Sequence, residues 1–279
     1  MKYKLLFIVS LLNAFACEKV VDVTIKSTEE FLVIEGGITH RINQMNDLQI
    51  IKLSKTINFF DQNSNAAVEN ATVTVSDGTT VYRFSSIGDG EYAAQVQTVI
   101  GNIYTLNIEY NGQLYEATET LITVPPIDSI YTVFEEETLF TDAGYLVKIN
   151  TTDPIGEVNY YNWKVYKNGE LFIVPDPGNR VDLIASDQFF NGQPLIGITP
   201  NEEAILEVGD QAKVEQHGVT ERFHNYLYEF YTQTGGNVFL GDPPPGRIKG
   251  NVINLSNPDQ IALGYFAVTS VAEAEITQE

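Results

Sequence analysis

The sequence predicts a mainly β protein with one packed α-helix, and two observations lead to this fold class. First, turn-forming dipeptides separate alternating apolar and polar runs: Asp77-Gly78, Asp89-Gly90, Asn111-Gly112 and Asn168-Gly169. Both central residues of a type I′ turn need positive φ, which Asn, Asp and Gly tolerate, so these dipeptides predict β-hairpins. Second, the runs are rich in Val, Ile, Thr, Tyr and Phe, which suit a pleated, half-buried surface.

Residues 29–124 are predicted to form an antiparallel sandwich of the immunoglobulin-like or transthyretin-like type. Seven short strands with regular turns are typical of that architecture. The expected strands are Phe31–Glu35, Leu48–Ser54, Ala71–Ser76, Thr80–Ser85, Tyr92–Gln97, Tyr104–Tyr110 and Leu114–Thr123.

Pro125-Pro126 interrupts this pattern, because consecutive prolines cannot continue a central strand. We therefore place a domain boundary there and expect a second β-rich domain over residues 127–279. Its last strand is predicted over Ala262–Val271, as a continuous buried run.

One helix is predicted near residues 219–232 in this second domain. Phe223, Leu227 and Phe230 recur there at helical spacing, which favours burial of that face against the second sheet. Thr220 is a suitable residue for the start of the helix, and the glycines that follow residue 234 would end it.

The N-terminus has the layout of a bacterial secretory signal. Residues 1–16 contain a basic start, a short apolar run and small residues, and Cys17, the single cysteine, follows directly. A cysteine at the first mature position predicts a lipoprotein, with lipid on the Cys17 thiol and residues 17–28 as a tether. Each buried methylene contributes about 0.8 kcal/mol, so two or three acyl chains anchor durably. The alternative is a cleaved signal with an incidental cysteine.

Charge limits the partners of this chain. The formal net charge is -21 and the pI is near 4.4, which argues against nucleic-acid binding because that requires a basic patch. The same charge argues against electrostatic adsorption to anionic lipid, so the acyl chains would have to hold the protein at the membrane.

The search for catalytic motifs predicts a non-enzymatic protein without cofactor or metal. The sequence has no glycine-rich phosphate loop, nucleophile elbow or zinc-protease motif. His217, Glu221 and His224 have ligand spacing for one helix face, but Gly218 favours a helix that starts later, and a solvated face is the simpler interpretation.

Calcium is a second metal possibility. Asp176, Asp182 and Asp187 lie in an irregular stretch and are the only candidates, whereas scattered surface charge is the competing explanation.

Two segments are candidate binding surfaces. Tyr160, Tyr161 and Trp163 form either an exposed sugar-binding platform or part of the core. Consecutive prolines favour polyproline II, so the segment Asp242, Pro243, Pro244, Pro245 and Gly246 is either a stiff partner-contact loop or a spacer.

Taken in order, several elements resemble uncharacterised outer-membrane lipoproteins of Bacteroidota, a family with a domain of unknown function often encoded beside TonB-dependent receptors. The elements are Cys17-Glu18-Lys19, Leu32–Gly36, Asn70–Val73, Gly90–Tyr92, Asp153–Gly156, Asn159–Trp163, Gly250–Val252 and Ala262–Phe266. Glu18 and Lys19 are similar to the phylum's surface-export signal, and Asp128-Ser129-Ile130 is similar to its O-glycosylation sequon, with Ser129 as acceptor.

The resemblance implies an outer-membrane location, on the cell surface or the periplasmic face, and a TonB-dependent barrel as neighbour. It implies no catalytic residue. We expect an accessory or substrate-capture partner of such a transporter, and the alternative is an independent surface module that binds glycan or protein.

Overall fold

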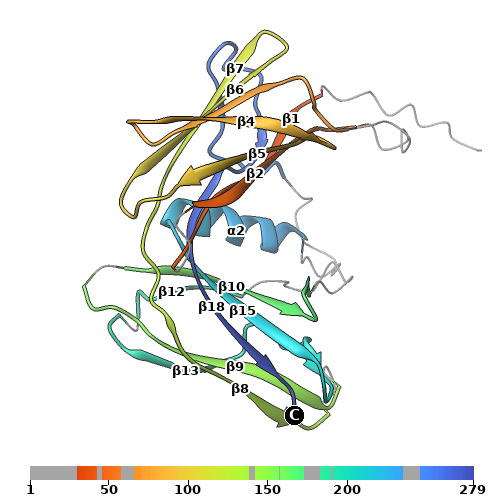
Figure 1. Ribbon diagram of the computed structural model, residues 1–279, viewed down its shortest axis with the longest axis vertical. Coiled ribbons are helices and arrows are strands. Elements are labelled where there is room, and N and C mark those ends of the chain that lie inside the picture. Colours follow the sequence, from red (N-terminus) through yellow and green to blue (C-terminus); the bar gives the residue numbers. More distant parts are fainter. Residues whose placement is uncertain are drawn as a thin grey trace, which may run out of the picture.

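The computed structural model describes residues 30–42, 46–57, 66–137, 142–156, 158–172, 183–189, 191–234 and 246–279. Within these ranges β-strands dominate, and α2 (Glu221–Thr234) is the one α-helix. The strands build an upper and a lower sandwich, with α2 lying between them (Figure 1). The predicted mainly β class with one packed helix is thus confirmed.

The upper sandwich contains all seven strands expected from the first half of the chain. Its strands are β1 (Leu32–Arg41), β2 (Asn46–Lys55), β3 (Thr72–Ser76), β4 (Val81–Gly88), β5 (Glu91–Gln97), β6 (Ile103–Tyr110), β7 (Gln113–Thr120), β16 (Ile253–Asn254) and β17 (Leu263–Gly264). Strand β4 belongs to both layers, because its first half pairs with β3 and its second half with β5. Ile51, Tyr92, Leu106 and Ile108 lie between the layers in a closely packed core.

Three of the four turn dipeptides have the backbone conformation that the sequence predicts. Asp89, Asn111 and Asn168 have φ of 53°, 50° and 53°, and each precedes a glycine that also has positive φ. Asp77 differs, since its carboxylate accepts hydrogen bonds from the N–H groups of Thr79 and Thr80 at 2.9 and 2.7 Å. That turn is therefore held by a side chain.

The lower sandwich packs two layers of strands around Trp163, Tyr161, Val214 and Ile149. One layer is a separate sheet of β8 (Ile127–Glu135), β9 (Gly144–Thr152), β13 (Pro194–Ile198) and β14 (Ile205–Leu206). The other contains β10 (Tyr160–Lys167), β11 (Glu170–Leu171), β12 (Leu183–Ser186), β15 (Gln211–Val219) and β18 (Ala267–Thr277), and it is one end of a 14-stranded sheet that continues through β1 into the upper sandwich.

Strands β1 and β18 join the two sandwiches. Leu32–Gly36 of β1 pairs with β2, whereas Gly37–Arg41 pairs in parallel with β18. A Cβ on Gly37 would lie 1.8 Å from the Ala267 carbonyl oxygen, so only glycine permits this approach. After Gly36, where β1 changes its partner from β2 to β18, the Gln49 carboxamide takes the place of a strand neighbour. It accepts a hydrogen bond from the Thr39 N–H at 2.7 Å and donates one to the Thr39 C=O at 2.9 Å.

Part of the C-terminal segment packs in the upper sandwich, which the predicted domain boundary did not anticipate. Residues 127–279 were expected to form one unit, yet Val252, Ala262, Phe266 and Val268 lie in the upper core. The expected strand Ala262–Val271 is also interrupted, since β17 ends at Gly264 and β18 begins at Ala267. An apolar run predicts burial but not which core it joins.

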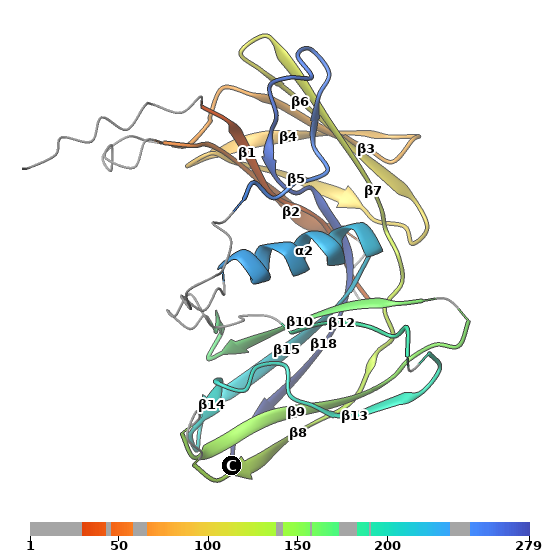
Figure 2. The ribbon, with the colours of Figure 1, turned by 180° about the vertical axis from the view of Figure 1, so that it is seen from behind.

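Helix α2 begins two residues later than predicted and contacts both sandwiches (Figure 2). The Thr220 hydroxyl accepts a hydrogen bond from the Phe223 N–H at 3.3 Å, so Thr220 caps the helix as expected. Leu227 is buried, but Phe230 is 41% exposed. The expectation that this whole face is buried on the second sheet is therefore wrong for Phe230 and also for Phe223, which is half-buried and stacks on Tyr265, because the helix lies across an open junction.

A candidate binding cavity beneath helix α2

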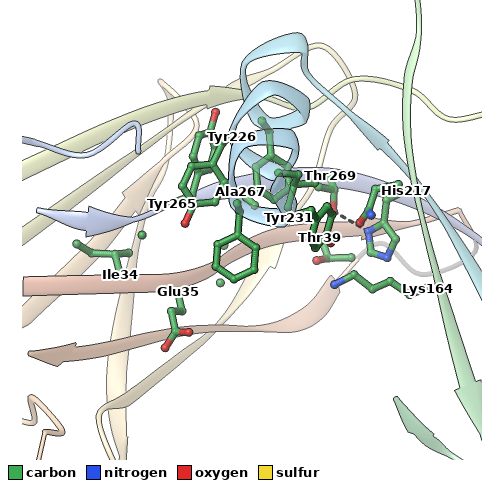
Figure 3. A pocket seen from close by; sticks show the side chains of 17 residues that line it. Ile34, Glu35, Thr39, Lys164, His217, Tyr226, Tyr231, Tyr265, Ala267 and Thr269 are labelled. Carbon is green, nitrogen blue, oxygen red and sulfur yellow. Dashed lines mark hydrogen bonds between the residues drawn. The ribbon is translucent and has the colours of Figure 1, made fainter. Parts of the chain in front are cut away.

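A cavity of about 400 Å³ lies where α2 meets the strands that join the sandwiches. Its walls come from α2, β1, β10, β15, β17 and β18, segments far apart in sequence. Figure 3 shows Tyr226 and Tyr265 toward one side and Lys164, His217 and Thr269 toward the other. Small-molecule sites are commonly of this size, about 300–1,000 Å³, and lie between structural units.

Aromatic rings form the first wall. The Tyr265 ring lies 4.7 Å from that of Phe223 and 4.9 Å from that of Tyr226, between ring centroids. Tyr226 continues the column to Phe230 at 6.4 Å. Such separations are those of interacting aromatic pairs. The rings hold one another in place and expose apolar surface to the cavity.

Tyr265 is held in turn by β7. Its hydroxyl donates to the buried Glu119 carboxylate, and the Arg222 guanidinium of α2 lies 3.4 Å from the same carboxylate. Burial and the hydrogen bond to Glu119 raise the pKa of Tyr265, so the hydroxyl stays protonated and donates at neutral pH. This contact fixes the first turn of α2 to the upper sandwich.

Polar side chains form the opposite wall because strand residues alternate between faces. On β10, Asn162 and Lys164 line the cavity, while Tyr161 and Trp163 lie in the core behind the sheet. Asn162 is paired in register with His217 of β15, which also lines the cavity.

Glu215 organises the charges beside this wall. Its side chain is 3% exposed and lies 3.3 Å from Arg41, 2.9 Å from Lys213 and 3.1 Å from His217. Burial opposes ionisation, but hydrogen bonds from His217 and Lys213 and the charge of Arg41 outweigh it, so the pKa of Glu215 lies well below its usual range. Glu215 is therefore ionised at neutral pH and pairs with Arg41 and Lys213.

Both ring nitrogens of His217 have hydrogen-bond partners. Nε2 lies 3.1 Å from Glu215, and Nδ1 lies 3.4 Å from the Thr269 hydroxyl. A general base needs a nitrogen within hydrogen-bond reach of the substrate, so this geometry favours a positioning role for His217.

Lys164 differs from these cations. Among the described residues, no carboxylate oxygen lies within 4.0 Å of its ammonium, although it lines the cavity. A chain with 37 acidic and 16 basic residues offers many possible partners, which makes this ammonium conspicuous.

The predicted aromatic platform is core. Tyr161 and Trp163 are each 1% exposed and stack at 5.3 Å, and the Trp163 indole donates to Gln216 at 2.8 Å. Their side chains cannot meet a ligand on the surface. Tyr160 lies on the other face, 5.1 Å from the His224 ring. The core interpretation therefore holds for Tyr161 and Trp163, and the residues that alternate with them, Asn162 and Lys164, line the cavity.

The predicted metal candidates do not come together. His217 belongs to β15, whereas Glu221 and His224 belong to α2, so they do not share one helix face. Within the described ranges, no group of three His, Cys, Asp or Glu side chains has the geometry to hold a metal.

Asp187 is buried instead of lying on the surface. It neighbours Asp153, and both carboxylates are at most 2% exposed. The Tyr161 hydroxyl donates to Asp153, as does the Gly192 N–H at 2.7 Å. Burial and the nearby Asp187 raise the pKa of Asp153. The pair ties the loop after β9 to the loop after β12.

Other predicted positions fall at the surface or outside the described ranges. Ser129 is exposed on β8 and accepts a hydrogen bond from Asn150 at 2.9 Å, and Gly246 is exposed. The signal residues 1–16, the tether with Cys17, and the remaining candidates lie outside the described residues; these last are Asp176, Asp182, Asp242, Pro243, Pro244 and Pro245. No described helix is long and apolar enough to cross a membrane.

Comparison with known protein families assigns this chain to a family. Residues 18–275 match the domain of unknown function DUF4249, so the chain belongs to that family. No curated protein matches its sequence. A crystal structure of bovine butyrophilin is similar at 9% identity and a TM-score of 0.24, with 89% of this chain and 99% of the butyrophilin chain covered.

Proposed function

We propose that this protein is a non-enzymatic lipoprotein of the outer membrane that captures a ligand for a TonB-dependent transporter. The observation that supports capture is the α2 cavity, with aromatic rings on one wall and polar groups on the other. A mixed lining of this kind orients a small molecule, and the junction between two packed units is a common place for such a site.

The polar residues favour binding over turnover. His217 is engaged by Glu215 and Thr269, and Arg41 and Lys213 are engaged by Glu215. Groups held in this way position one another and do not present a free base or nucleophile to a substrate.

The membrane part of the proposal is supported by Cys17 and by the resemblance stated above. Lipid on Cys17 would confine the protein to the bilayer surface, which raises its effective concentration beside a membrane partner. A modest protein contact would then suffice for a lasting complex.

The test is affinity capture of a tagged full-length protein from detergent-solubilised outer membrane, followed by mass spectrometry. We expect a TonB-dependent barrel to co-purify. The Cys17→Ser protein is the control, and it should leave the membrane fraction and recover much less barrel. If the wild-type protein recovers no transporter in a detergent that preserves other barrel–lipoprotein complexes, the partnership is wrong, and the independent glycan- or protein-binding module replaces it.

A further inference from the structure

The two walls of the α2 cavity fit a ligand that has both an apolar surface and a polar surface. Tyr226, Phe230 and Tyr265 offer apolar ring faces, whereas Thr39, Asn162 and Thr269 offer hydrogen-bonding groups. The alkyl chain of a fatty acid would remove water from these polar groups without offering them a hydrogen bond, which costs binding free energy. A flat aromatic ligand would need apolar surface on both faces. A sugar ring has an apolar C–H face and a hydroxylated edge, so it matches both walls.

Lys164 adds a charge requirement. It is the one lysine or arginine among the described residues that line this cavity, and no described carboxylate lies within 4.0 Å of its ammonium. The other cations on that side of the sheet already have carboxylate partners, since Lys213 pairs with Glu215 and Arg41 pairs with Glu215 and Asp47. A carboxylate on the ligand would give Lys164 a charge-assisted hydrogen bond.

The volume of the cavity and the net charge of the protein narrow the class of ligand further. A cavity of about 400 Å³ accommodates a mono- or disaccharide. A protein with net charge -21 repels polyanions at long range, so a long polyuronate is disfavoured. A single carboxylate is repelled less than a polyanion, and at Lys164 it meets local attraction.

We propose that the α2 cavity binds a mono- or disaccharide with one carboxylate, its acid group on Lys164 and its apolar face against Tyr226 and Phe230. This inference rests on the proposed ligand-capture function and adds the ligand class. His217 and Thr269 then lie beside the sugar hydroxyls. Glu215 fixes the orientation of the His217 ring, and the ring in turn contacts the Thr269 hydroxyl.

The experiment is calorimetric titration of the Cys17→Ser protein with matched methyl glycosides. The probes are methyl glucuronide and methyl galacturonide, and the neutral controls are methyl glucoside and methyl galactoside, which lack only the acid. We expect at least one uronide to bind about tenfold or more tightly than its neutral counterpart, a difference of about 1.4 kcal/mol.

Variants assign that difference to the cavity. Lys164→Met should remove the preference for the acid while leaving the unfolding midpoint unchanged. Lys52→Met alters an exposed lysine of β2 outside the cavity and should leave binding unchanged. Phe230→Ala should weaken acid and neutral sugars alike, because it removes apolar surface without touching the charge.

Three results would overturn the inference: equal affinity for acid and neutral sugars, no heat from any of them, or an acid preference that survives Lys164→Met. Capture of a transporter together with a failed titration would leave the proposed function standing with the wrong ligand class. Sugar binding without a transporter would sustain the cavity assignment and refute the partnership.

Discussion

The two faces of the β10–β15–β18 sheet differ completely in chemistry although they share the same strands. Behind the sheet, Trp163, Tyr161 and Val214 fill a core from which water is excluded. In front of it, Lys164 and His217 border a cavity. Because side chains alternate along a strand, β10 contributes Tyr161 and Trp163 to the core and Asn162 and Lys164 to the cavity. Substitutions on the two faces should therefore separate stability from binding.

The largest expected effect comes from the core face. Trp163→Ala should destabilise the protein by about 3–5 kcal/mol, because it removes a large buried ring and its hydrogen bond to Gln216. Chemical denaturation measures this. Lys164→Met, one residue away on the other face, is the matched control and should change stability by less than about 0.5 kcal/mol. Equal losses for the two variants would break the comparison.

Helix α2 gives the next effect. Leu227→Ala should cost about 2–3 kcal/mol, since Leu227 is buried at the junction of the sandwiches. The exposed neighbour Tyr228→Ala is the control and should cost far less. A loss below roughly 0.5 kcal/mol for Leu227→Ala would mean that α2 is not packed on the sheets in solution.

Glu215 should contribute about 2 kcal/mol through its buried contacts. Glu215→Gln removes the charge that holds Arg41, Lys213 and His217, although the partly exposed Arg41 and Lys213 regain some hydration. The folded-state pKa of Glu215 is depressed below its ordinary 4.5, so its stabilisation is complete above pH 4.5. It is lost as pH falls from there toward the folded-state pKa. Denaturation at pH 7 and at pH 3 should show the gap between wild type and Glu215→Gln narrowing, and a widening gap would contradict the sign.

The smallest expected effect is at the helix cap. Thr220→Ala should cost about 1 kcal/mol, because the hydroxyl accepts from the Phe223 N–H. Thr220→Ser keeps an acceptor and should retain most of the stability in the same denaturation measurement. Identical losses for alanine and serine would show that the cap does not contribute.

The sequence predicted local structure well and long-range placement poorly. Asn111-Gly112 and Asn168-Gly169 determine their turns through their own φ angles, so hairpins could be located without knowing the fold. The alternating run before Asn168-Gly169 was expected to be a strand, and it forms β10. Which face of it was open could not be predicted, since that depends on α2 crossing the junction.

The cavity itself depends on contacts between distant segments. Tyr265 reaches Glu119 across 146 residues, and Phe266 joins the upper core although its neighbours in β18 run into the lower sandwich. Period and composition report only how buried a residue is, so Tyr226 and Tyr265 carried no separate signal in the sequence. The one local hint was Lys164 itself, a charge inside an aromatic strand.

The most direct test of a division between a structural face and a binding face is a crystal structure of the Cys17→Ser protein grown with the uronide that binds best. The result predicted is ligand density beneath α2, with its carboxylate within hydrogen-bond distance of the Lys164 ammonium and its ring against Tyr226 and Phe230. Density at another surface, or an empty cavity at a saturating concentration of the sugar, would contradict it.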